Sequence, residues 1–160
     1  DTFEGNAVIK AEAYARMSGM LTLADDSGLE IDALNGEPGV HSKRFAGEDA
    51  TDEDRVRIVL QKLDGVPWEK RTAQYRCVIA VAELGINTVT CESVCSGIIG
   101  HELRGSGGFG YDPVFYLPEY DQTVAELPLK EKNKISHRAK AVKQAVVLLK
   151  ERTNSRFLDI

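Results

Sequence analysis

Residues 73–97, AQYRCVIAVAELGINTVTCESVCSG, determine the fold that we expect for this chain. Two runs in this stretch alternate with a period of two, starting at Ala73 and Val89, and a short turn near Gly85 and Asn87 separates them. Side chains along a strand point alternately to opposite faces, so each run predicts a long strand. Two such strands joined by a short turn predict a β-hairpin.

Upstream of this hairpin, apolar residues at helical spacing predict one helix over residues 1–19 and another over residues 51–65. Thr51 is a good N-cap for the second of these helices. Between them we expect two short strands, residues 21–24 and residues 29–33, with a turn separating the two.

Downstream of the hairpin, a brief strand is expected at residues 114–117, followed by a last helix that begins near Ser136. The apolar spacing of that helix predicts an inward face made of Ala139, Val142, Val146 and Leu149. Helices that alternate with strands, together with one long antiparallel pair, predict an α/β fold with a twisted sheet and flanking helices. We interpret residues 1–160 as a single domain.

Charge and cysteine content restrict the class of protein. The formal net charge of −5 argues against wrapping around a nucleic-acid polymer, which needs a basic face, but a small phosphorylated ligand needs only a local cluster of cations. The odd set Cys77, Cys91 and Cys95 favours buried thiols in a reducing compartment. No apolar run reaches membrane-spanning length, and no signal peptide is found, so we expect a cytoplasmic protein without a membrane partner.

The segment Asp25-Asp26-Ser27-Gly28 follows an apolar run and is the first candidate for chemistry. Neighbouring side chains of an extended chain point to opposite faces, so only one of the two carboxylates should face a given site. A carboxylate at the end of a strand can hold Mg²⁺, which prefers oxygen ligands. Asp, Ser and Gly also form ordinary turns, and that interpretation stays open here.

Residues 105–112, GSGGFGYD, form a second candidate. Their glycines allow backbone amides to approach a ligand closely. Phe109 and Tyr111 offer flat faces for a nucleobase, and Asp112 can accept hydrogen bonds from a base edge. A flexible turn between strands explains the same residues equally well.

The third candidate is the start of the last helix, Ser136-His137-Arg138, with Lys132 shortly upstream. Amide groups at a helix start attract anions, and the Arg and His side chains add donors there. The alternative is an ordinary N-cap with exposed neighbours.

In this order, the segments resemble the inosine/xanthosine triphosphate pyrophosphatase family, a Ham1-like family of pyrophosphatases for non-canonical purine nucleoside triphosphates. The matching segments extend over most of the chain: residues 2–11 (TFEGNAVIKA), 24–29 (ADDSGL), 38–40 (PGV), 44–47 (RFAG), 107–113 (GGFGYDP), 125–127 (AEL) and 132–138 (KNKISHR).

This resemblance implies an elongated mixed sheet with flanking helices, two lobes around a central cleft, and a homodimer. It implies hydrolysis of ITP, dITP and XTP to the monophosphate and pyrophosphate, which cleanses the nucleotide pool, with Mg²⁺ as cofactor. By position, Asp26 would be the metal ligand and general base, with Asp25 supporting it. Substrate contacts would come from Lys10, Ser27, Phe109, Gly110, Tyr111, Asp112, Lys132, His137 and Arg138.

Two features of the family are not found in residues 1–160. These are an N-terminal strand with a Thr/Ser-x-Asn-x-x-Lys phosphate-binding loop, and a second acidic metal ligand that we expect upstream of this chain. His41 also stands where the family often has Tyr. Two alternatives therefore remain: a non-catalytic nucleotide-binding fragment, and a pyrophosphatase for other modified nucleotides.

Overall fold

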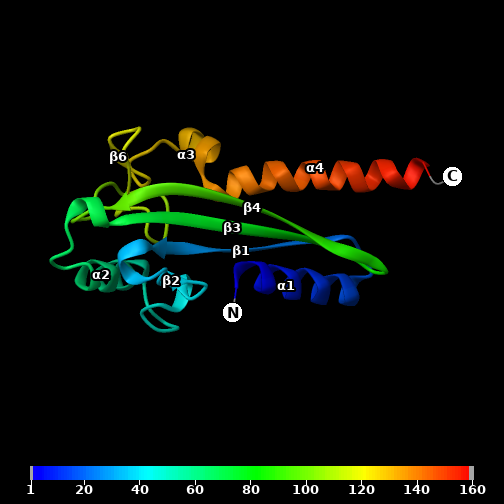
Figure 1. Cartoon of the computed structure of the whole chain (residues 1–160), viewed down its shortest axis with the longest axis horizontal. Helices are drawn as coiled ribbons and strands as arrows, with labels where there is room; N and C mark the ends of the chain where they lie inside the picture. Colours follow the sequence, from blue (N-terminus) through cyan, green and yellow to red (C-terminus); the bar gives the residue numbers. More distant parts are fainter. Residues whose placement is uncertain (1, 159–160) are drawn as a thin grey trace. The chain divides into compact units, whose positions relative to one another are not determined.

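The computed structural model describes residues 2–158, and side chains as far as residue 152. In this part of the chain six strands form one sheet in the order β2-β1-β3-β4-β5-β6 (Figure 1). The strands are β1 (Thr22–Ile31), β2 (Pro38–Gly39), β3 (Thr72–Glu83), β4 (Ile86–Ile99), β5 (Phe115–Leu117) and β6 (Gln122–Thr123). The helices are α1 (Phe3–Ser18), α2 (Asp52–Lys62), α3 (Leu129–Ile135) and α4 (His137–Leu158), with short 3₁₀ turns at Asp32–Leu34, Ser42–Arg44 and Trp68–Lys70.

The α/β fold class and the central hairpin are confirmed. β3 and β4 are joined only by Leu84 and Gly85, and Gly85 has a φ of +75° that suits glycine in a tight turn. The pairs β1–β2, β4–β5 and β5–β6 are antiparallel. None of the helices in the described part of the chain is both long and apolar enough to cross a bilayer.

The prediction of two short strands before α2 is wrong. A single strand, β1, continues through Asp25, Asp26, Ser27 and Gly28, where we expected a turn. The turn preference of these residues is local, and the side chains of the first three instead bind groups on neighbouring elements or on one another. The acidic segment therefore lies inside an extended strand.

By its contacts the chain divides into two compact units, and β1, β3 and β4 contribute residues to both. The first unit contains residues 1–27, 77–93 and 137–160, and the second contains residues 28–76 and 94–136.

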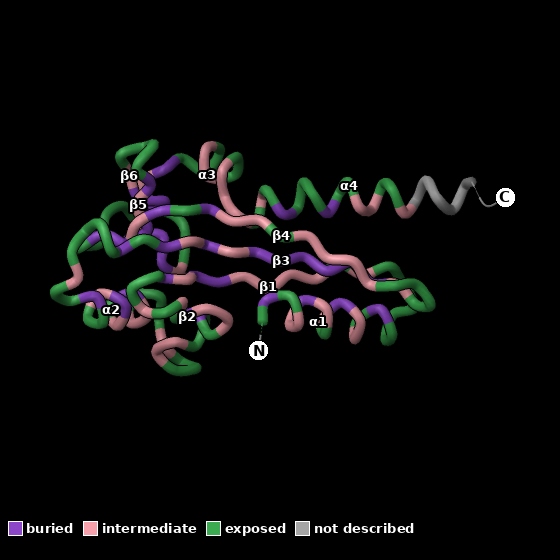
Figure 2. The backbone as a smooth tube through the Cα atoms, in the orientation of Figure 1, coloured by how far each residue is buried: buried purple, intermediate pink, exposed green. Residues whose placement is uncertain are grey.

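In the first unit, α1 and α4 pack on opposite faces of the strands. Thr88 of β4 donates to Glu12 of α1, whereas Cys91, three residues later and on the other face, contacts the carbonyl oxygen of Ala141 on α4. Both faces of β3 are consequently buried over residues 77–82 (Figure 2). This explains a run of consecutive apolar residues where a half-exposed strand would alternate.

The start of α1 and the inward face of α4 differ from the prediction. The N-cap of α1 is Thr2, whose hydroxyl accepts from the amide of Gly5, and Asp1 lies outside the described residues. On α4 the buried residues are Ala141 and Ala145, while Val142 and Val146 are exposed, so the predicted inward face is wrong for these two valines. Alanines let the helix approach Cys77 and Ile79 of β3 closely.

The second unit holds the larger apolar core. Tyr75 of β3 stacks on Phe115 of β5 with ring centroids 4.3 Å apart, and α2 contributes Val56 and Val59. The predicted N-cap of α2 is confirmed, because Thr51 forms a complete capping box with Asp54. The helix α3 was not predicted.

Candidate functional site

The predicted site residues fall into two groups, one in each unit. We call the group in the first unit the acidic cluster; it comprises Asn6, Lys10, Asp25, Asp26, Ser27 and Arg138. We call the group in the second unit the loop cluster; it comprises residues 105–112 with Tyr75 and Lys132.

In the acidic cluster, Asp26 is held by side chains of α1. Its Oδ1 accepts from Lys10 Nζ at 2.7 Å, and its Oδ2 accepts from Asn6 Nδ2 at 3.0 Å. Asn6 and Lys10 are four residues apart, so both project from one face of the helix. Lys10 Nζ also donates to the carbonyl oxygen of Asp25 at 2.6 Å. The Lys10 ammonium group therefore binds both the backbone and a side chain of β1. The Asp26 side chain remains 19% exposed.

Asp25 has different partners, because its side chain points to the α4 face. Its Oδ2 accepts from Arg138 Nε at 3.2 Å and from Ser27 Oγ at 3.0 Å. Ser27 lies two residues along the strand and therefore shares this face. His137 begins α4 and is half-buried. The cationic start of α4 thus meets Asp25, whereas the cation that meets Asp26 comes from α1.

The thiol of Cys77 lies against the same face, with Sγ 4.0 Å from Asp25 Oδ2. Burial raises the pKa of Cys77, which keeps the sulfur protonated and a weak nucleophile. This supports the interpretation of Cys77 as a structural thiol.

In the loop cluster, Asp112 is buried and organises its neighbours. Its Oδ2 accepts from the Phe109 amide at 2.9 Å and from Lys132 Nζ, and its Oδ1 accepts from the Tyr75 hydroxyl at 3.2 Å. Burial, and then the charge of Asp112, raise the pKa of Tyr75, so the hydroxyl remains a donor. Both oxygens of Asp112 therefore have donors within the protein.

Phe109 presents an exposed aromatic face. The residue is 60% exposed, and Lys132 Nζ lies 4.5 Å from the ring centroid. The ammonium group, which can only donate hydrogen bonds, lies over one face of the ring, so a planar base would stack on the other face. Lys132 lies in α3, the short helix that immediately precedes α4.

The glycine-rich loop is tightly packed, which argues against a loose connection. A Cβ on Gly108 would lie 2.1 Å from Asp112 Oδ2, and one on Gly105 would lie 2.6 Å from the carbonyl carbon of Ala125. Both glycines have positive φ, which L side chains rarely adopt. The alternative of a flexible turn does not explain these close approaches.

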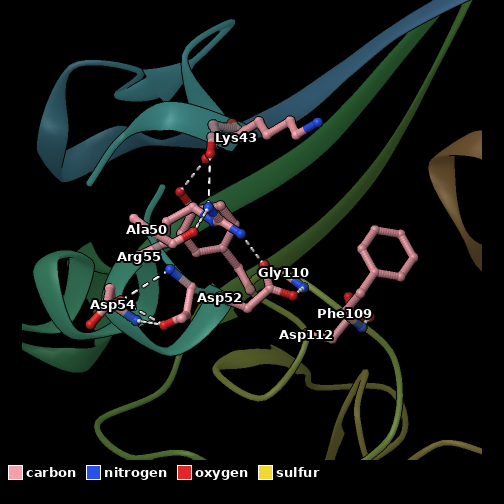
Figure 3. A network of polar contacts seen from close by, with 11 residues as sticks. Lys43, Ala50, Asp52, Asp54, Arg55, Phe109, Gly110 and Asp112 are labelled. Atoms are coloured by element: carbon pink, nitrogen blue, oxygen red, sulfur yellow. Dashed lines mark hydrogen bonds and ion pairs between the residues drawn. The ribbon is translucent and has the colours of Figure 1, made fainter. Parts of the chain in front are cut away.

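Residues that the sequence analysis missed hold the tip of this loop (Figure 3). Asp52 Oδ2 accepts from the Gly110 amide at 2.6 Å. Arg55 pairs with Asp52 and donates to the carbonyl oxygens of Lys43 at 2.9 Å and Ala50 at 2.6 Å. The Gly110 amide, and then Arg55, lower the pKa of Asp52. The spacing of Asp52 and Arg55 on a predicted helix indicates their pairing, but no local pattern indicates the contact with Gly110.

Tyr111 anchors the next position of the loop. Its hydroxyl donates to the carbonyl oxygen of Ser42 at 2.7 Å, and burial raises its pKa. Ser42 in turn donates to the Gly39 carbonyl oxygen and accepts from the Leu29 amide. Tyr111 is 4% exposed, so its ring packs in the core and does not offer the flat surface that Phe109 offers.

Comparison with known proteins identifies the family. Residues 1–148 match the model of the Ham1 family. The chain belongs to the Ham1 family. Ham1 relatives include the dITP/XTP pyrophosphatase of Desulforamulus reducens, 56% identical over 93% of this chain and 74% of that protein. The dITP/XTP pyrophosphatase of Bacillus subtilis is 51% identical over 92% of this chain and 75% of that protein.

Solved Ham1 structures agree with this fold. A HAM1 protein from Coxiella burnetii aligns with a TM-score of 0.89 at 47% identity, over 94% of this chain and 77% of that one. The Ham1 protein of Staphylococcus aureus aligns with a TM-score of 0.90 at 42% identity, over 95% of this chain and 78% of that one. The predicted family resemblance is confirmed.

Proposed function

We propose that this chain hydrolyses non-canonical purine nucleoside triphosphates, ITP, dITP and XTP, to the nucleoside monophosphate and pyrophosphate. The observation that carries the proposal is the Asp26 carboxylate held between Lys10 and Asn6, in a Ham1 family member whose relatives are dITP/XTP pyrophosphatases. A partly exposed carboxylate can accept a proton from water, and the lysine beside it can stabilise negative charge on a phosphate chain.

In the proposed reaction, a water oxygen attacks the α-phosphorus while Asp26 accepts the proton of that water. The bond between the α-phosphorus and the bridging oxygen breaks, and pyrophosphate leaves with the bonding electrons. Lys10 Nζ, 2.7 Å from Asp26, supplies positive charge where negative charge builds on the phosphates. Asn6 fixes the second carboxylate oxygen and so orients Asp26.

The carboxylates of the acidic cluster suit a Mg²⁺ ion that keeps several of its waters better than an ion surrounded by protein ligands. Mg²⁺ is commonly held by one or two carboxylates, several waters and substrate phosphates. Among the described residues, no group of three or more His, Cys, Asp or Glu could hold a metal. Asp26 would be one protein ligand, with Asp25 supporting it from the other face of β1. When bound, the ion would neutralise charge on the triphosphate.

We propose that the loop cluster selects the base. Phe109 offers an exposed ring for stacking, and Lys132 Nζ, a group that only donates, lies over one face of that ring. Hypoxanthine and xanthine present an acceptor oxygen at position 6, whereas adenine presents an amino group that also donates. Sites built on such hydrogen bonds can discriminate by roughly 10⁴-fold. The backbone amides of the loop are further candidate donors.

A substrate panel tests this function. Pyrophosphate release should be strong with ITP, dITP and XTP and weak with ATP, and comparable rates on all four would overturn the proposed selectivity. Binding of ITP in a calorimeter without pyrophosphate release would identify a non-catalytic nucleotide-binding fragment. Preference for modified pyrimidine or methylated nucleotides would identify a pyrophosphatase for other modified nucleotides.

We further propose a cytoplasmic homodimer. Cys77, Cys91 and Cys95 form no disulfide among the described residues, which suits a reducing compartment. Apolar side chains of the first unit are exposed, among them Met17 at 82% and Tyr14 at 62%, and a second copy could cover such residues. Light scattering coupled to size-exclusion chromatography tests the dimer, and a monomer mass at micromolar concentration would contradict it.

A further inference from the structure

Two different carboxylates hold consecutive amides at the tip of the glycine-rich loop. Asp112, inside the loop, accepts from the Phe109 amide at 2.9 Å, and Asp52, at the start of α2, accepts from the Gly110 amide at 2.6 Å. The two backbone amides on either side of the Phe109 Cα are therefore each held by a carboxylate. Figure 3 shows Phe109 and Gly110 beside Asp52 and Asp112.

Asp52 is itself fixed in position. Arg55 pairs with Asp52 and is anchored by the carbonyl oxygens of Lys43 and Ala50. The side chain of Arg55 is only 13% exposed, so this arrangement is more ordered than a typical surface pair. The carboxylate of Asp52 consequently reaches the Gly110 amide from a rigid helix start.

Phe109 is mostly uncovered by packing, so backbone contacts at its own amide and at the Gly110 amide contribute to the position of its ring. The residue is 60% exposed, and Lys132 Nζ, which is held by the buried Asp112 carboxylate, lies over one face of its ring. Gly110 has a φ of +62°, and a Cβ placed on it would meet no atom within 4 Å. Glycine at an uncrowded position can adopt many backbone conformations. The hydrogen bond from Gly110 to Asp52 therefore restricts a backbone that steric contacts do not restrict.

We propose that Asp52 is a positioning residue for base recognition, which holds Gly110 so that Phe109 presents one fixed face to a 6-oxopurine. The inference rests on the proposed function, because the substrate class follows from it. Preorganisation of a binding group lowers the entropy lost when a ligand binds. Loss of Asp52 should therefore weaken recognition of the base and leave the chemistry at Asp26 largely intact.

The experiment compares Asp52→Ala and Asp52→Asn with the matched control Glu53→Ala. Glu53 is the next residue of α2 and carries the same charge, but it pairs with Arg57 and is 72% exposed. The probe is inosine monophosphate, whose affinity is measured by calorimetry without any turnover. Hydrogen exchange of the peptide covering residues 107–112 reports on the loop directly, and kcat and KM are measured with ITP.

For Asp52→Ala we expect IMP to bind about tenfold more weakly, as for the loss of a hydrogen bond to a charged group, and exchange in residues 107–112 to accelerate. KM for ITP should rise while kcat stays within about twofold of wild type, since the group lost only positions the loop. Asp52→Asn should fall between Asp52→Ala and wild type, because its amide oxygen can still accept from Gly110. Glu53→Ala should match wild type.

Unchanged IMP affinity and loop exchange in Asp52→Ala would overturn the proposal, as would an equal loss in Glu53→Ala. If Asp52→Ala does not fold, Asp52→Asn decides, and wild-type affinity and exchange in that variant would also overturn it. Wild-type protein that fails to bind IMP would overturn it as well. Failure of the hydrolytic function is distinguishable, because it would appear as wild-type protein that binds IMP but releases no pyrophosphate from ITP.

Discussion

The carboxylates of Asp25 and Asp26, adjacent in sequence, lie on opposite faces of β1 and bind cations from different helices. Asp26 is paired with Lys10 of α1, and Asp25 is paired with Arg138 of α4. Strand geometry requires this separation, because consecutive side chains alternate between faces. The two acids therefore cannot substitute for one another, and their variants should behave differently.

The first prediction concerns these two acids. Asp26→Asn should nearly abolish pyrophosphate release from ITP, because the amide is neither a proton acceptor nor a good partner for Lys10. Asp25→Asn should retain more activity, because its contacts with Arg138 and Ser27 support the cluster from the other face. A discontinuous pyrophosphate assay measures both. An Asp26→Asn rate above roughly a tenth of wild type would refute the role of Asp26 as the general base.

The second prediction concerns base selectivity. Lys132→Met should narrow the preference for ITP over ATP by about tenfold or more, because it removes the donor that lies over the Phe109 ring. The measurement is the ratio of kcat/KM for the two substrates.

Lys134→Met is the matched control for this prediction. Lys134 lies on the same helix, α3, is 56% exposed and pairs with Glu131 rather than with the loop cluster. The ITP to ATP ratio should stay at the wild-type value in this variant. An equal change in both variants would indicate a general effect of charge and would count against Lys132.

The third prediction concerns stability against pH. The Gly110 amide, and then Arg55, lower the pKa of Asp52 in the folded protein relative to the unfolded chain. A folded pKa below the unfolded value means that the stabilisation is complete above about pH 4 and is lost as pH falls through the folded pKa. Urea unfolding should therefore find Asp52→Asn less stable than wild type at pH 6.

This difference should shrink as the pH falls below about 4, because Asp52 then binds a proton first in the unfolded state and, at lower pH, in the folded state as well. Measurement of the urea midpoint for both proteins at several pH values between 3 and 6 checks the direction. A difference that stays constant, or grows, as pH falls would show that the Asp52 charge does not contribute in this way.

The fourth prediction separates backbone strain from steric crowding in the loop. Gly85 and Gly108 have nearly equal φ values, +75° and +77°, but a Cβ at Gly85 meets no atom within 4 Å, whereas one at Gly108 lies 2.1 Å from Asp112 Oδ2. Gly85→Ala should destabilise by about 1–2 kcal/mol, the usual cost of a left-handed L residue. Gly108→Ala should cost more, because Asp112 must also move.

Differential scanning calorimetry of the two variants gives the comparison, and IMP binding gives a second readout. Gly108→Ala should weaken IMP binding, since displacement of Asp112 disturbs the Phe109 amide and Lys132. Gly85→Ala lies in the β3–β4 turn and should bind as wild type does. Equal destabilisation of the two variants would mean that the loop adjusts without cost.

Much of the architecture was predictable because it is encoded in short-range patterns. The alternation in residues 73–97 identified the hairpin, and Thr51 identified the start of α2. The three segments with candidate chemistry were also recognisable, because each combines residue types with a known chemical preference. Their assignment to the Ham1 family followed from the order and content of the segments.

Other features depend on contacts between residues that are far apart in sequence. Local turn preference favoured a break at Asp25-Asp26-Ser27-Gly28, and contacts with α1 and α4 keep this segment extended instead. The apolar spacing of α4 did not reveal that Ala141 and Ala145 face the strand. Burial of a small side chain contributes little hydrophobic free energy. The stabilising effect of an alanine therefore depends on how closely a specific neighbour packs against it.

The acceptor for Gly110 illustrates the same limit within the site. Asp52 precedes it by 58 residues, and neither helical nor strand periodicity relates positions so far apart. Composition could name the aromatic, acidic and cationic groups of this chain. Which carboxylate holds which amide, and which cation meets which acid, depends on how the folded chain places rigid elements beside each other.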